Sequence, residues 1–141
     1  MKKLLILCLL VLLVGCSNKP QEITTYQALD DILEKRDEGK YKEAVVYDLR
    51  DGQVCSDGHI KGFTCIFYQS SLTIDDVYNN INIVYSKKAL ILLMCEDGTI
   101  SLSLAGRLTE AGYKNVYYFA GGYLEYCQQN KDFIPETGCE C

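Results

Sequence analysis

An uninterrupted apolar run that ends in a cysteine is the feature that most restricts how this chain can fold. Residues 89–94 are apolar throughout, Cys95 follows, and a Gly-containing loop leads into a helix that can begin at Ser101. Such a run fits a central strand of a parallel sheet, because those strands are covered on both faces. The strand–loop–helix points backbone N–H groups and the positive end of a helix dipole at the sulfur. We therefore predict a nucleophilic thiolate at Cys95 that handles a small anion; the competing interpretation is a buried cysteine that only packs.

The rest of the chain alternates helix and strand patterns. Alternation of this kind implies right-handed crossovers and one α/β domain, with a central parallel sheet flanked by helices on both faces. The predicted elements are a helix opening at Thr24–Thr25 with a Thr24…Gln27 capping spacing and ending at Gly39, a strand over 44–47 closed by Asp48, a helix after Thr73, a strand over 89–94, a helix over 101–111 and a strand over 116–119.

The N-terminal residues have the pattern of a secretory signal. Lys2 and Lys3 precede an apolar run over residues 4–14, which is shorter than the roughly 20 residues of a membrane-spanning helix. The following L-V-G-C segment resembles the lipobox of bacterial lipoproteins, in which the signal is cut before a cysteine that becomes lipidated. This resemblance implies a lipid on Cys16, whereas a plain secretory signal would leave Cys16 incidental.

These features predict the domain organisation and the location of the chain. We expect a lipoprotein signal peptide over 1–15, the lipidated Cys16 and a linker over 16–23, and one domain with a Cys-containing tail over 24–141. The lipid would anchor that domain to the extracytoplasmic face of the cell membrane.

The charge balance excludes one class of partner. The net charge is −5 at pH 7, and removal of a signal that holds Lys2 and Lys3 would make the domain more acidic. Because no basic stripe is present, the sequence argues against nucleic acid and against electrostatic attraction to anionic lipid.

Cysteine usage fits an oxidising compartment. If Cys95 stays free as a nucleophile, five cysteines remain outside the predicted signal and Cys16, so one of them is unpaired or is a partner of Cys95. We favour a pair between Cys55 and Cys65, which flank a short loop, and a pair between Cys127 and either Cys139 or Cys141. A zinc site is disfavoured by the lack of a C-x-x-C pair and by the single histidine, so we expect no metal and no cofactor.

Three motifs, in this order and spacing, resemble those of the rhodanese-like (sulfurtransferase) family over about residues 24–127. Y-D-L-R at 47–50 matches its strand followed by D-x-R, and G-H-I-K-G-F at 58–63 matches its G-H-I-x-G-A turn. C-E-D-G-T-I-S at 95–101 matches its active-site loop, and the later A-G-G at 120–122 matches its Gly-Gly turn before the last helix. The resemblance implies a single rhodanese-like domain.

The resemblance also implies roles for individual residues. Cys95 would take a sulfane sulfur from a small donor as a persulfide and pass it to a thiol acceptor. The backbone N–H groups that would cradle the persulfide and the donor belong to Glu96, Asp97, Gly98, Thr99, Ile100 and Ser101. Scaffold roles are expected for Asp48, Arg50, Gly58, His59, Gly121 and Gly122.

The active-site loop departs from the family pattern in its charge. Ile100 occupies the position five residues after the cysteine, where many family members have a basic residue or a hydroxyl. Glu96 and Asp97 add negative charge beside the thiol. These residues favour a persulfide or polysulfide donor over thiosulfate.

Two alternative functions stay open at this stage. One is a rhodanese-fold binding or sensing module without turnover, and the other is thiol–disulfide chemistry in which Cys95 pairs with Cys139 or Cys141. A phosphatase-type reaction is disfavoured because Ser101 stands where such enzymes need an arginine.

Overall fold

Five parallel strands form the central sheet, in the order β1-β5-β4-β2-β3. The computed structural model describes residues 19–68 and 71–139. The strands are β1 (Gln21–Ile23), β2 (Ala44–Asp48), β3 (Thr64–Cys65), β4 (Leu90–Met94) and β5 (Asn115–Phe119). The helices are α1 (Tyr26–Asp37), α2 (Gly52–Asp57), α3 (Ile74–Val84), α4 (Thr99–Glu110) and α5 (Gly122–Gln129).

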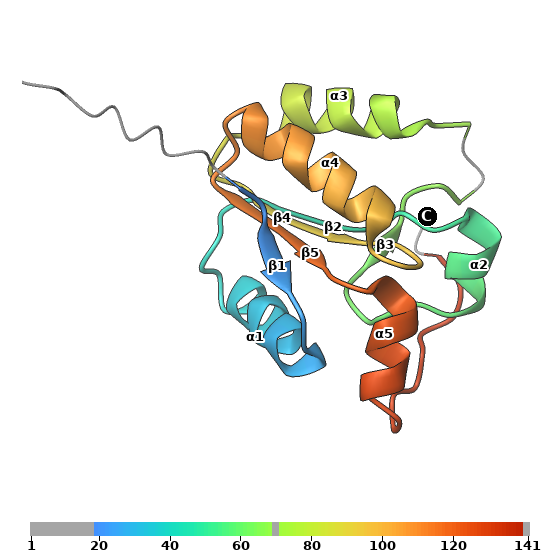
Figure 1. The fold of residues 1–141 in the computed structure, drawn as a ribbon. Helices are drawn as coiled ribbons and strands as arrows, with labels where there is room; N and C mark the ends of the chain where they lie inside the picture. The colour runs from blue at the N-terminus through green and yellow to red at the C-terminus, as the bar shows by residue number, and fades with distance from the viewer. Residues whose placement is uncertain (1–18, 69–70, 140–141) are drawn as a thin grey trace, which may run out of the picture.

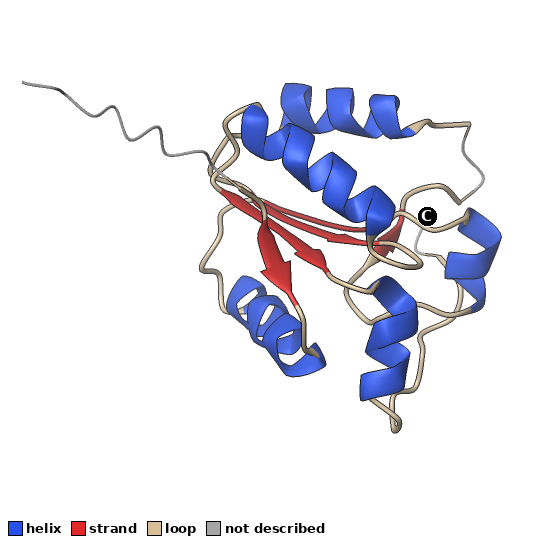
Figure 2. Ribbon diagram, in the orientation of Figure 1, coloured by secondary structure: helices blue, strands red, loops and turns tan. Residues whose placement is uncertain are grey.

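Helices cover both faces of the sheet, as predicted (Figures 1 and 2). Helices α3 and α4 pack on one face, in a core that contains Ile81, Leu104 and Leu108. Helix α1 and part of α5 pack on the other face, in a core that contains Leu29 and Tyr126. Every residue of β4 is buried, because this central strand contributes side chains to both cores. The predicted α/β fold with a doubly covered parallel sheet is confirmed.

The starts of three predicted helices agree with the structure to within two residues. Helix α3 begins after Thr73, whose side chain forms a reciprocal capping box with Asp76. In α1 the N-cap is Thr25, whose hydroxyl accepts from Ala28 N–H, so the predicted capping pair beginning at Thr24 was wrong by one residue. Helix α4 starts at Thr99, two residues before the predicted start, because Gly98 takes the left-handed N-cap conformation.

Three short elements were not predicted. The segment interpreted as a linker over 16–23 contributes residues 21–23 to the sheet as the edge strand β1, which pairs with β5. This strand has one buried side chain, Ile23, so its stability comes from backbone pairing that no hydrophobic pattern reveals. Strand β3 has two residues and α2 has six, and both are too short to produce a periodic signal.

The part of the chain that the structure describes contains no helix that is long and apolar enough to cross a membrane. The predicted signal over 1–15 and the predicted lipidation site Cys16 lie outside the described residues.

Candidate active site around Cys95

Cys95 lies directly after the carboxyl end of β4, where the loop 96–98 leads into α4. Its thiol is the centre of a small set of donors: Sγ accepts from Gly98 N–H at 3.2 Å and from Ser101 N–H at 3.4 Å. The residue is only 2% exposed. Backbone N–H groups directed at sulfur stabilise the thiolate over the thiol, and they do so most strongly where water is excluded. The geometry is therefore that of an anion-binding loop with sulfur as the bound atom.

The hydroxyl of Ser101 is a further polar group at the sulfur. Ser101 is fully buried, and its Oγ lies 3.2 Å from Cys95 Sγ and 3.2 Å from Gly98 O, to which it donates. A hydroxyl in this position accepts from a thiol S–H and rotates to donate to a thiolate. From the sequence, only the backbone of Ser101 was predicted to lie at the site. The signal for its side chain was a serine on the buried face of a helix, because a buried hydroxyl needs a hydrogen-bond partner.

The N-terminus of α5 holds the loop in shape from outside. Tyr123 N–H donates to Cys95 O at 2.8 Å, and Leu124 N–H donates to Glu96 O at 3.2 Å. Gly122 makes this approach possible: its φ is +65°, and a Cβ there would lie 2.5 Å from both of those carbonyl oxygens. The Gly121–Gly122 pair, expected to form a turn beside the loop, thus lets the N–H groups of Tyr123 and Leu124 reach the carbonyls of that loop.

The two acidic residues after Cys95 are both exposed. The Asp97 carboxylate accepts from the Thr99 hydroxyl at 2.7 Å and from Thr99 N–H at 3.0 Å. These bonds lower the pKa of Asp97, which stays ionised as a local cap of α4. Glu96 and Ile100 are exposed. The loop therefore presents a mixed acidic and apolar outer surface, while the N–H groups of Gly98 and Ser101 face the sulfur. Of the six N–H groups expected to cradle the sulfur, that of Thr99 donates to Asp97 instead.

Asp48 and Arg50 form a buried ion pair behind the loop. Arg50 Nη2 donates to Asp48 Oδ2 at 2.7 Å and to the carbonyl of Gly58 at 2.7 Å, which ties the end of β2 to the G-H-I turn. Burial alone would lower the pKa of Arg50, but the hydrogen bonds and charge of Asp48 raise it. The Arg50 guanidinium also stacks on the Tyr123 ring, 3.6 Å from its centroid. Both charges are thus engaged within the protein.

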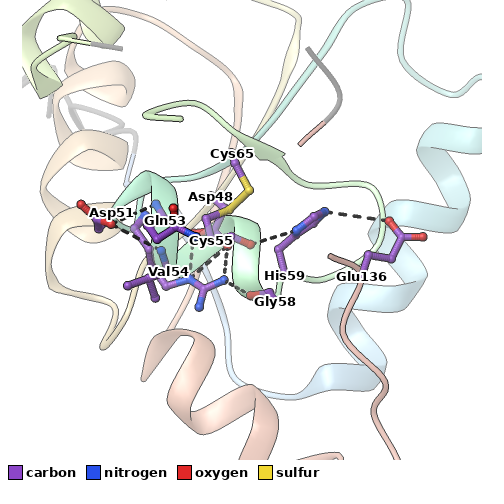
Figure 3. Close-up of a disulfide and its surroundings, with 10 residues drawn as sticks. Asp48, Asp51, Gln53, Val54, Cys55, Gly58, His59, Cys65 and Glu136 are labelled. Carbon is purple, nitrogen blue, oxygen red and sulfur yellow. Dashed lines mark hydrogen bonds and ion pairs between the residues drawn. A yellow bond between two sulfur atoms is a disulfide. The ribbon is translucent and has the colours of Figure 1, made fainter. Parts of the chain in front are cut away.

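His59 lies in the G-H-I turn, and its hydrogen bonds are to α2 and the C-terminal tail. Its Nδ1 lies 3.0 Å from Cys55 O, and its backbone forms an antiparallel bridge with Glu136 (Figure 3). Cys55 and Cys65 form a disulfide beside it, the pairing favoured from the sequence. The structure therefore places His59 in a turn that the disulfide and the tail enclose.

The other predicted disulfide is absent from the described residues. Cys127 and Cys139 are both free thiols, so they do not pair with each other. The other predicted pairing, Cys127 with Cys141, stays a prediction because Cys141 lies outside the described residues. Cys127 lies on α5 and interacts with Tyr123. The pKa of Tyr123 is raised to about 12, mainly by burial and then by the Cys127 thiol. Cys139 lies beside α2 instead, since its neighbour Gly138 donates to Ser56 O. Cys127 thus lies on α5 and Cys139 in the C-terminal tail.

A groove of about 1300 Å³ lies between the end of α1, the G-H-I turn and the C-terminal tail. Its lining includes His59, Cys65, Glu136 and Cys139. Cys95 is not part of it, so the groove and the thiol loop are separate features. Cys95 and Cys139 are not bonded to each other, and Cys141, the other partner named for the thiol–disulfide alternative, lies outside the described residues.

The fold and the loop together define an α/β protein in which the buried thiol of Cys95 is held by backbone amides at the carboxyl end of the central strand. The rhodanese-like domain family matches residues 27–129 of this chain. The chain belongs to the rhodanese-like domain family.

Individual relatives agree with this assignment. The chain is 35% identical over 80 residues to the thiosulfate sulfurtransferase GlpE of Pseudomonas entomophila (strain L48), across 57% of this chain and 67% of that protein. It is 30% identical over 85 residues to the thiosulfate sulfurtransferase GlpE of Haemophilus influenzae (strain KW20), across 60% of this chain and 74% of that protein.

Solved structures share the fold at lower identity. The Alr3790 protein from Anabaena sp. matches with a TM-score of 0.54 and 20% identity, over 76% of this chain and 77% of that one. A thiosulfate sulfurtransferase from Pseudomonas aeruginosa matches with a TM-score of 0.56 and 18% identity, over 84% of this chain and 20% of that one.

Proposed function

We propose that this chain is a sulfurtransferase that carries sulfane sulfur as a persulfide on Cys95. The observation that carries the proposal is the set of three polar groups around Cys95 Sγ, from Gly98 and Ser101. Such donors stabilise the thiolate that attacks a donor and then the anionic persulfide that results. The similarity to thiosulfate sulfurtransferases supports the same reaction class.

The transfer proceeds in two balanced displacements. The Cys95 thiolate attacks the outer sulfur of the donor, and the S–S bond of the donor breaks with its electron pair leaving on the inner sulfur. An acceptor thiolate then attacks the outer sulfur of the Cys95 persulfide, whose S–S bond breaks and returns the Cys95 thiolate. No external oxidant or reductant is consumed, because the sulfane sulfur keeps its oxidation state.

The loop surface bears on the class of donor. Its exposed residues are Glu96, Asp97, Thr99 and Ile100, and none of them supplies a cation for the sulfonate of thiosulfate. We propose polysulfide or a low-molecular-weight persulfide as the preferred donor, thiosulfate as a poorer one, and a thiol as the acceptor.

The location is proposed on sequence grounds together with one structural feature. The L-V-G-C segment ends at Cys16, and the Cys55–Cys65 disulfide suits a compartment outside the cytoplasm. We propose a lipid anchor on Cys16 at the extracytoplasmic face of the cell membrane. Intact mass of the chain extracted from membranes tests this: Cys16→Ala should abolish both lipid mass and signal cleavage before residue 16.

Intact mass after exposure to polysulfide tests the sulfur chemistry directly. The reduced chain should gain one cyanide-removable sulfur, and Cys95→Ser should not. Cys127→Ser is the matched control, because it removes another free thiol and should load normally. Equal loading of Cys95→Ser and the unmodified chain would refute the proposal.

A charge introduced at position 100 tests the donor preference. Ile100→Arg should raise the rate of loading from thiosulfate several-fold, an effect on the order of 0.5–1 kcal/mol, and should change loading from a neutral persulfide little. Leu102→Arg is the control, because Leu102 and Ile100 both lie on α4 and are both 45% exposed. Residues two positions apart do not share a helix face, so the arginine at position 102 points in a different direction. Equal stimulation by both variants would show only a general charge effect and contradict the assigned role of position 100.

A further inference from the structure

A cluster of metal-ligand side chains lies away from Cys95. Cys55, His59 and Cys65 are all buried, and their ligand atoms lie within 4.8 Å of one another. The sequence disfavoured a metal because it contains no C-x-x-C pair and one histidine. The fold makes up for this by bringing β3 beside α2 and the G-H-I turn, so that residues ten positions apart meet.

We infer that reduction of the Cys55–Cys65 disulfide converts this cluster into a binding site for Zn²⁺. Two thiolates and one imidazole are the ligands that structural and catalytic zinc sites use. Ligand atoms that share a tetrahedral zinc at about 2.0–2.3 Å lie roughly 3.3–3.8 Å apart. The present spacing is within about 1.5 Å of that range, so the site needs adjustment of side chains rather than of the fold.

The surroundings of His59 suit a metal ligand. Its Nδ1 lies 3.0 Å from the Cys55 carbonyl oxygen, and its Nε2 lies 4.0 Å from a carboxylate oxygen of Glu136 (Figure 3). If Nε2 binds the ion, Nδ1–H donates to the Cys55 carbonyl oxygen in its present position; if Nδ1 binds it, Glu136 must move closer to accept from Nε2–H. Ligating histidines generally have such a second partner, which fixes the tautomer and the ring orientation.

The ion also has a route to the cluster. His59 and Cys65 both line the groove of about 1300 Å³ beside the C-terminal tail. Solvent in this groove supplies the fourth ligand. Cys139 lines the same groove and keeps a free thiol there, at the mouth of the site.

Reduction of the Cys55–Cys65 disulfide needs one co-reactant, a dithiol. A dithiol gives two electrons and two protons to the Cys55–Cys65 bond and becomes a disulfide itself. Zn²⁺ then replaces the two thiol protons, which leave to solvent. The disulfide form holds no free thiolate in this cluster and should not bind the ion, so metal occupancy reports the redox state of the surroundings.

Zinc titration of the full chain in detergent, in its oxidised and its reduced form, tests the inference. The oxidised chain is the matched control, because it keeps every thiol outside the cluster. We expect one more tightly bound Zn²⁺ per chain after reduction, measured with a chromophoric chelator after removal of free metal. Co²⁺ in place of Zn²⁺ should give the ligand-field absorption of a tetrahedral thiolate site.

Variants then assign the ligands. His59→Gln should weaken Zn²⁺ binding by the reduced chain at least tenfold, and Cys127→Ser should leave it unchanged. The inference is overturned if the reduced chain, shown by circular dichroism to be folded, gains no metal, or if both variants bind equally. Because loading of Cys95 with sulfur is a separate measurement, failure here leaves the proposed transfer reaction untouched.

Discussion

The substitution Gly122→Ala tests whether α5 shapes the thiol loop. Gly122 has φ +65°, and an added Cβ would lie 2.5 Å from Cys95 O and from Glu96 O. The left-handed conformation costs an alanine about 1 kcal/mol. The contacts would push α5 off the loop and lengthen two hydrogen bonds, each worth about 0.5–1.5 kcal/mol. We therefore expect a loss of about 2–4 kcal/mol in the free energy of unfolding.

Gly39→Ala is the control for this experiment. Gly39 has φ +80° but no atom within 4 Å of the added Cβ, so only the backbone cost of about 1 kcal/mol applies. Both substitutions restrict the unfolded chain equally, so the difference between them isolates the contact with the loop. That difference corresponds to about 1 M in the urea midpoint for a domain of this size.

Two measurements decide the result. Urea denaturation followed by circular dichroism gives the stability of each variant, and alkylation with iodoacetamide gives the reactivity of Cys95. Gly122→Ala should alter the alkylation rate by displacing the N–H groups of the loop, and Gly39→Ala should not. Equal midpoints for the two variants, or an unchanged rate for Gly122→Ala, would refute the reasoning.

Two further predictions concern single side chains. Ser101→Ala removes a buried hydroxyl 3.2 Å from the loop sulfur and should slow persulfide loading about tenfold, since a hydrogen bond to a charged group contributes roughly 1.5 kcal/mol; the exposed Ser103→Ala on the same helix should load normally. The capping bonds from Thr73 lower the pKa of Asp76 below its ordinary value of 3.8. The unfolded chain therefore binds a proton at Asp76 more readily than the folded chain does, so the Thr73–Asp76 capping box stabilises the fold above that pH. The stability difference between the unmodified chain and Asp76→Asn should be constant near neutral pH and shrink as the pH falls below about 4 in acid-series urea titrations; a difference that is independent of pH would contradict the capping role.

The elements that could be predicted from the sequence are those whose pattern repeats over several turns or is uniformly apolar. Strand β4 and helix α4 are of this kind, and they alone place Cys95 at the end of a central strand. The motif residues Asp48 and Gly58 could be assigned to the scaffold through the family resemblance, and the structure shows the bonds from Arg50 that join them.

The features that escaped prediction depend on contacts between distant parts of the chain. The partner of Cys127 could not be chosen because cysteine spacing carries no information about which elements lie side by side, and Cys139, one of the two candidates, is not bonded to it. The grouping of Cys55, His59 and Cys65 could not be predicted for the same reason, since it needs α2 and β3, which have no periodic signal. The contact of the Ser101 hydroxyl with Cys95 Sγ was also not predicted, because it depends on the burial of that side chain.

The way the loop holds sulfur explains how two acidic residues can follow the nucleophile. The groups that contact Cys95 Sγ are two backbone N–H groups and one hydroxyl. Backbone donors do not change when an exposed side chain does, so residues such as Ile100 can vary the donor preference without altering the stabilisation of the thiolate. What the loop does require is its shape, which depends on Gly98 at φ +91° and Gly122 at φ +65°. In the proposed reaction the glycines therefore fix the loop shape that holds the thiol, while the charged and apolar surface of the loop would select the sulfur donor.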